Sequence, residues 1–83
     1  MLYTFDKLES NFWEVFEEKL NKRQQYVLIK RFGLDREQPR SQQWIADLFG
    51  CSRQNIRRIE KRGLRLLKFY ITKRIIAAKP SPE

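Results

Sequence analysis

The stretch SQQWIADLFGCSRQNIRRIEKRGLRL, residues 41–66, contains two short amphipathic segments separated by a tight turn. Ala46 is small enough to let a second helix cross closely, and Gly50 can adopt the positive φ that ends a first helix. The hydroxyl of Ser52 can accept a hydrogen bond from a backbone N–H in the first turn of the second helix and so cap that helix. This pattern predicts a helix-turn-helix over residues 41–68.

Amphipathic helices are also predicted before this motif. Apolar side chains recur at every fourth position within residues 5–20, which is the spacing of one helix face. Asn21 and Gln24 have the spacing of a helix cap, and they open a second helix that is expected to stop at Gly33. Residues 34–40, which include a proline, then form a loop.

The helix that begins at Arg53 has two possible lengths. It either continues to Ala78 or breaks near Phe69, because the apolar residues of its last part do not all fit one buried arc. A chain of 83 residues is long enough for one domain with a thin core. We therefore predict an all-α fold of four to five helices, with a single domain over residues 1–79 and a disordered tail at residues 80–83.

Length and composition exclude several classes of protein. The chain has one cysteine and no histidine, so neither an internal disulfide nor a zinc site is expected. No apolar run reaches the roughly 18 residues of a membrane span, and the N-terminus lacks the pattern of a signal peptide. No glycine-rich loop or nucleophile elbow accompanies the acidic residues, so we expect a cytoplasmic protein that is not an enzyme and needs no cofactor.

Positive charge is concentrated in the second helix of the motif. The net charge is +8, yet residues 1–20 carry −3 and residues 21–83 carry +11. Within residues 53–74, nine Lys or Arg stand against one acidic residue, Glu60, which we interpret as the ion-pair partner of a neighbouring Arg. On a helical wheel the cations fall on one side and most of the apolar residues on the other. This division is typical of a helix that binds the phosphate backbone of nucleic acid.

Three segments of the chain carry a more specific signature: LNKRQQYVLIKRFGLD at 20–35, IA at 45–46, and SRQNIRRIEKRGLRLL at 52–67. Together they resemble region 4 of the bacterial sigma-70 family of sigma factors, over about residues 20–68. The resemblance implies a domain that binds double-stranded DNA at the −35 promoter element while a hydrophobic cleft grips the flap of the RNA polymerase β subunit. It also implies a protein encoded by a bacterium or a phage, and we expect a monomer when it is free.

The resemblance further implies DNA-binding roles for individual residues. The family's recognition helix reaches base edges and nearby phosphates at the positions occupied here by Arg53, Gln54, Arg57 and Arg58. Gln54 departs from the glutamate that is usual in housekeeping members, and its amide suits adenine or a phosphate rather than cytosine. Backbone phosphates are the expected partners of residues on both helices of the motif, namely Ser41, Gln42, Gln43, Lys61 and Arg65. For the first three of these, helix capping and solvation are an equally good interpretation.

Polymerase binding is assigned by the same resemblance to apolar residues of two helices, Val27, Leu28, Phe32, Leu64 and Leu67. The chain lacks the upstream regions with which sigma factors open a promoter, so it is either a fragment or a free-standing region 4-like protein. Met1 and the N-terminal helix favour the free-standing protein. What would supply recognition of the −10 element is not encoded in residues 1–19.

Two other functions remain open at this stage. A protein-interaction regulator of the anti-sigma or co-activator type would occupy the β flap without sequence-specific DNA binding. A small dimeric helix-turn-helix repressor would use a seam formed by Phe69, Ile71, Ile75 and Ile76. The first alternative predicts no DNA binding at physiological salt, and the second predicts a dimer in solution.

Overall fold

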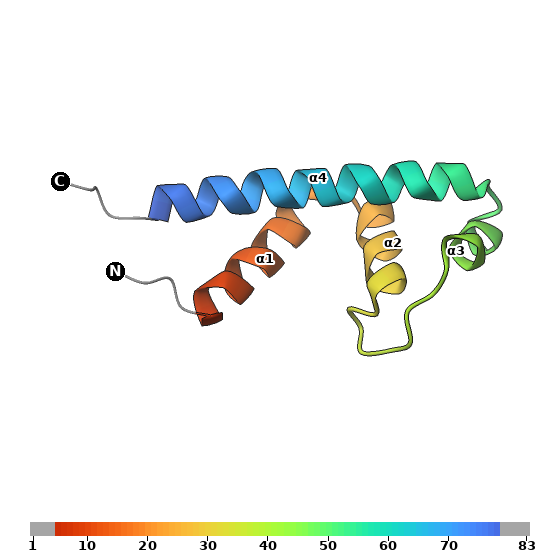
Figure 1. The fold of residues 1–83 in the computed structure, drawn as a ribbon, viewed down its shortest axis with the longest axis horizontal. Helices are drawn as coiled ribbons and strands as arrows, with labels where there is room; N and C mark the ends of the chain where they lie inside the picture. The colour runs from red at the N-terminus through yellow and green to blue at the C-terminus, as the bar shows by residue number, and fades with distance from the viewer. Residues whose placement is uncertain (1–4, 79–83) are drawn as a thin grey trace.

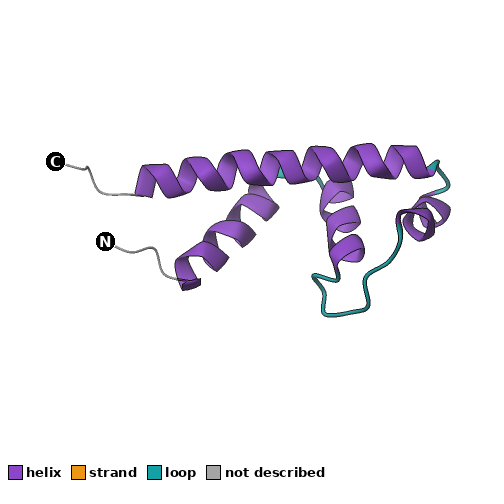
Figure 2. Cartoon of the chain, in the orientation of Figure 1, coloured by secondary structure: helices purple, strands orange, loops and turns teal. Residues whose placement is uncertain are grey.

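The computed structural model describes the backbone of residues 5–78 and the side chains of residues 11–74. Within this part of the chain there are four helices and no strand, which confirms the predicted all-α fold (Figure 2). The helices are α1 (Phe5–Lys19), α2 (Lys22–Phe32), α3 (Gln42–Phe49) and α4 (Arg53–Ala78). The predicted tail at residues 80–83 lies outside the described residues, and the single domain over residues 1–79 stays a prediction.

Helix α4 is the axis of the molecule, and the three shorter helices pack along it (Figure 1). It has 26 residues and continues to Ala78 without a break near Phe69, so the longer of the two expected helices is the one observed. At 1.5 Å per residue it is about 39 Å long, which makes it the longest element of the fold. Helices α3 and α4 form the helix-turn-helix at one end, and α1 packs on the other half of α4.

The helix ends lie where local side-chain chemistry predicts them. Asn21 and Gln24 form a reciprocal capping box at the start of α2, in which Asn21 Oδ1 accepts from the Gln24 N–H at 2.8 Å. Gly33 and Gly50 adopt left-handed φ values of 66° and 69° and end α2 and α3. Ser52 Oγ accepts from a backbone N–H in the first turn of α4 at 3.1 Å. These caps fix where the two helices of the motif begin and end.

Two hydrophobic clusters hold the helices together. The first joins α1 and α2 to the middle of α4 through Val15, Phe16, Leu20, Leu28 and Leu67. The second joins α2 and α3 to the start of α4 through Val27, Ile45, Ala46 and Ile56. All members of the second cluster are fully buried, so the helix-turn-helix is packed against α2 and does not stand alone.

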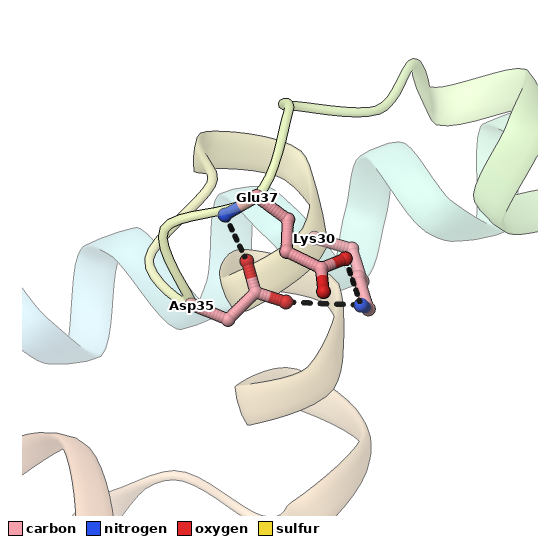
Figure 3. A network of polar contacts seen from close by, with 3 residues as sticks. All are labelled: Lys30, Asp35 and Glu37. Atoms are coloured by element: carbon pink, nitrogen blue, oxygen red, sulfur yellow. Dashed lines mark hydrogen bonds and ion pairs between the residues drawn. The ribbon is translucent and has the colours of Figure 1, made fainter.

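The loop between α2 and α3 is fastened to the last turn of α2. Lys30 Nζ lies 2.9 Å from a carboxylate oxygen of Asp35 and 3.7 Å from one of Glu37 (Figure 3). The other Asp35 oxygen accepts from the Glu37 N–H at 3.1 Å, and the Arg40 N–H donates to the Lys30 carbonyl at 2.8 Å. The loop therefore delivers Ser41, the cap of α3, to a defined place beside α2.

Candidate nucleic-acid interface

The first turns of α4 present a polar, cationic face to solvent. Arg53, Gln54, Arg57 and Arg58 are all exposed, whereas Ile56 on the opposite side of the same helix is fully buried. The buried face packs against α2 and α3, which leaves the exposed face free to enter a groove. The structure thus brings together the four residues that the family resemblance assigns to DNA reading, although their contacts with DNA stay a prediction.

The cationic face continues along α4. Lys61 and Arg65 are exposed, and among the described side chains no acidic group lies within salt-bridge distance of them or of the arginines at the start of the helix. Gln54, Arg57, Arg58 and Lys61 line one shallow hollow of about 290 Å³. A second hollow of about 640 Å³ follows, lined by Arg58, Lys61, Arg62, Arg65 and Leu66. Unpaired cations along adjoining hollows suit a polyanion such as the nucleic-acid backbone.

Sequence reasoning missed part of this surface. A further groove of about 500 Å³ places Lys19 and Arg23 opposite Arg58 and Arg62. Lys19 ends α1 and Arg23 lies in the first turn of α2, so only the packing of these helices on α4 adds them to the cationic face. The overall −3 charge of residues 1–20 hid Lys19, and no local signal in the sequence could have found it.

The three candidates at the start of α3 have intramolecular partners. Ser41 Oγ accepts from the Trp44 N–H at 3.0 Å and so caps α3. Gln43 Nε2 donates to Asp47 at 2.9 Å, and Gln42 Nε2 donates to Glu60 Oε1, also at 2.9 Å. The capping interpretation of Ser41 is confirmed. Phosphate contacts from these three residues stay a prediction.

Glu60 is the ion-pair partner of an arginine, as the sequence predicted. Its Oε1 lies 3.2 Å from Arg31 Nε, and its side chain is 13% exposed. It is the one acidic residue of α4, and it points toward α2 and α3 instead of toward the cationic face. The one carboxylate of the cationic helix is thus directed into the scaffold.

The five predicted polymerase-binding residues divide into two groups. Val27, Leu28 and Leu67 are 0%, 1% and 6% exposed and belong to the two hydrophobic clusters, where a partner cannot reach them. Phe32 and Leu64 are 45% and 41% exposed. Only these last two are placed for direct contact with another protein in this structure.

The predicted dimer seam is also divided. Phe69 is 54% exposed, but Ile71 is half-buried and packs against the first hydrophobic cluster. The side chains of Ile75 and Ile76 lie outside the described residues. Of the two seam residues whose side chains are described, one therefore belongs to the surface and the other to the core.

No helix in the described part of the chain is long and apolar enough to cross a membrane. The described residues likewise contain no group of metal-binding side chains. A helix-turn-helix packed on a scaffold of two further helices, with a cationic second helix turned outward, defines the class of helix-turn-helix DNA-binding proteins.

Comparison with known protein families identifies the family within this class. The family Sigma-70, region 4 matches residues 18–68, which is more than half of the chain, and the chain belongs to this family. It is also similar to the RNA polymerase sigma-28 factor of Bacillus thuringiensis subsp. kurstaki, with 44% identity over 45 residues. That alignment covers 54% of this chain and 19% of the sigma factor, so the chain spans about a fifth of that relative. The family resemblance predicted from the sequence is confirmed, and the chain is a sigma-factor-like DNA-binding module.

Proposed function

We propose that this protein binds promoter DNA of the −35 type through the first turns of α4 and docks on the flap of the RNA polymerase β subunit. The observation that carries the proposal is the exposed face of Arg53, Gln54, Arg57 and Arg58, opposite which Ile56 of the same helix is fully buried. Its role is recruitment in the cytoplasm and involves no catalysis. Membership of the sigma-70 region 4 family supports this assignment.

DNA contacts are divided between base edges and backbone. Arg53 and Arg57 are the candidates for two-pronged hydrogen bonds to guanine, and each such contact is worth about 1–3 kcal/mol of discrimination. Gln54 suits adenine or a phosphate. Phosphate contacts come from Arg58 and from the cations along the adjoining hollows, Lys61, Arg62, Arg65, Lys19 and Arg23. Affinity falls as salt concentration rises, and each neutralised phosphate makes the slope of log affinity against log salt concentration more negative by about 0.9.

Polymerase docking involves two of the apolar side chains that the fold leaves exposed, Phe32 and Leu64. Phe32 ends α2, and Leu64 lies on α4 one turn beyond Glu60, the residue that pairs with Arg31 of α2. Val27, Leu28 and Leu67 lie in the hydrophobic clusters that join α2 to α4. A single small DNA-binding module buries only about 600–1,000 Å² of protein surface, so tethering to polymerase would supply affinity that DNA alone does not.

The DNA-binding part of the proposal is tested by fluorescence anisotropy with a duplex that carries a −35 element and a scrambled duplex of equal composition. Arg53→Ala and Arg57→Ala should each weaken binding to the −35 duplex by about 5–150-fold more than binding to the scrambled duplex. Lys73→Ala, which removes an exposed cation from the distal half of α4, serves as the charge-matched control. Equal losses on both duplexes would reduce the two arginines to phosphate contacts.

The polymerase-binding part is tested by calorimetry with an isolated β-flap domain. Saturable one-to-one binding that Phe32→Ala and Leu64→Ala abolish is the expected result. Leu48→Ala, at a 55% exposed position on α3, is the control for loss of an exposed apolar side chain. Absence of binding by the unmodified chain would leave a generic DNA-binding regulator, and flap binding without duplex discrimination would instead favour the protein-interaction regulator.

A further inference from the structure

A single carboxylate oxygen joins three helices at the back of the DNA-binding motif. Glu60 Oε1, on α4, accepts from Gln42 Nε2 at 2.9 Å and lies 3.2 Å from Arg31 Nε. Gln42 is the first residue of α3, and Arg31 belongs to the last turn of α2. The oxygen thus links the end of the scaffold helix, the start of the first motif helix and the third turn of the recognition helix.

Directional contacts matter here because the apolar packing around them is non-directional. Helix α3 has only eight residues and packs on α2 and α4 through one small apolar cluster, beside which the Phe49 ring lies 5.4 Å from that of Tyr26. Apolar contacts hold such a helix close but tolerate small rotations, whereas a hydrogen bond to a largely buried carboxylate fixes both distance and direction. Glu60 therefore supplies the orientation that the cluster does not.

The charge of Glu60 has a second function. Arg31 Nε is buried and has no hydrogen-bond partner among the described residues, since its contact with Glu60 lacks hydrogen-bond alignment. The negative charge at 3.2 Å is then what compensates this nitrogen. A glutamine at position 60 could place an amide oxygen there but not the charge, so we expect Gln to replace Glu only in part although its shape is similar.

We propose that Glu60 is a positioning residue for DNA reading, and that Gln42 acts through Glu60 instead of donating its amide to a phosphate. The Glu60 carboxylate sets the placement of α3 and α4 against α2, and this placement determines whether Arg53 and Arg57 meet the correct base edges. The inference rests on the proposed function for its DNA readout. Its effect on α3 is independent of DNA.

The change in DNA affinity caused by Glu60→Gln distinguishes the positioning role from simple electrostatics, because the two predict changes of opposite sign for the −35 duplex. Removal of a negative charge from a DNA-facing helix would by itself strengthen binding to every duplex. The positioning role predicts that affinity for the −35 duplex falls by about 3–30-fold while affinity for the scrambled duplex is unchanged or higher. Glu37→Gln, an equal charge change at an exposed loop carboxylate, should leave the ratio of the two affinities unchanged.

Glu60→Asp keeps the charge but shortens the side chain by one methylene, so it should lose discrimination without the electrostatic gain. Arg31→Met combined with Glu60→Gln leaves no unpaired charge in the core and provides a folded variant if Glu60→Gln alone unfolds. Under the positioning role this double variant is folded, as judged by circular dichroism, and still discriminates poorly. Full discrimination by the folded double variant or by Glu60→Gln would overturn the proposal.

Gln42→Ala distinguishes positioning from phosphate contact. A phosphate ligand would lower affinity for both duplexes by the same factor, and the salt slope would not change because the amide is neutral. A residue acting through Glu60 lowers affinity for the −35 duplex alone and adds little to the effect of Glu60→Gln. Additive losses on both duplexes would overturn the assignment of Gln42.

Amide hydrogen exchange over residues 45–49 gives a readout without DNA. Exchange in this segment should accelerate in Glu60→Gln and Gln42→Ala but not in Glu37→Gln, because only the first two changes release α3. If the unmodified protein fails to discriminate the duplexes while exchange responds as expected, the proposed function is wrong and the positioning contact stands. Unchanged exchange in both variants would overturn the positioning role itself.

Discussion

The two glycines that end α2 and α3 differ in their surroundings although their backbones are alike. Gly33 has φ 66° and Gly50 has φ 69°, both in the left-handed region. A Cβ at Gly33 would lie 2.6 Å from the Glu37 carbonyl oxygen and 3.3 Å from Pro39 Cγ. A Cβ at Gly50 would have no neighbour within 4 Å. Replacing each with alanine therefore separates backbone strain from steric overlap.

The cost at Gly50 is conformational only. Left-handed backbone costs an L-residue about 1–2 kcal/mol, and the lower chain entropy of unfolded alanine returns about 0.4–1 kcal/mol. Gly50→Ala should thus lower the free energy of unfolding by about 0.5–1.5 kcal/mol. Gly33→Ala has the same cost of left-handed backbone. It also displaces the loop backbone at Glu37, which lowers the free energy of unfolding by about 1–3 kcal/mol more. We expect a total loss of about 1.5–4.5 kcal/mol at Gly33.

Urea unfolding followed by circular dichroism measures both losses under the same conditions. The difference between the variants is the decisive quantity, because the backbone term is common to both and cancels. Gly50→Asn, which tolerates left-handed backbone better than alanine, should be the least destabilised of the three. Equal losses for the two alanine variants, or a larger loss at Gly50, would refute the argument that the loop crowds Gly33.

Two further predictions concern charged contacts. Arg74→Met removes the contacts of Arg74 with Glu14 and Glu18 that join α4 to α1. It should lower the free energy of unfolding by about 0.5–1.5 kcal/mol in dilute buffer and by less in 1 M salt, since the pairs are largely exposed; an equal loss at both salt concentrations would assign the effect to packing. Hydrogen bonding to Lys30 lowers the pKa of Asp35, so its stabilisation is present above the unfolded pKa and is lost as pH falls through the folded pKa. Melting temperatures measured from pH 7 to pH 2 should therefore fall less for Asp35→Asn than for the unmodified protein, and parallel curves would contradict this linkage.

Local signals made much of the fold predictable. The caps at Asn21 and Ser52 and the stops at Gly33 and Gly50 depend on residues within one turn of the helix end, so the sequence contains all the information needed. The length of α4 depended on a distant element and stayed open. Ile71 is covered by contacts with the first hydrophobic cluster, which includes residues of α1, and this explains why the helix continues although its apolar residues do not fit one arc.

The candidate site was predictable to the extent that it lies on one helix. Helical periodicity placed Arg53 and Arg57 on an exposed face, and the structure agrees. Periodicity could not separate buried apolar residues from exposed ones on α2, because a core contact and a docking contact need the same kind of side chain. Leu28 and Phe32, one turn apart, are 1% and 45% exposed.

The segment that matches the family does not contain all the residues that bury the hydrophobic core. The match covers residues 18–68, yet Leu67 is buried in a cluster completed by Val15 and Phe16 of α1. Most of α1 and the part of α4 beyond residue 68 lie outside the match and pack on each other, so they act as a cover for apolar residues of the matched segment. The apolar contacts of this cover lie beyond the exposed arginines in the first turns of α4, although Lys19 at the end of α1 extends the cationic face. Substitutions among these apolar contacts can therefore be interpreted without direct disturbance of Arg53 and Arg57, the proposed DNA-reading residues.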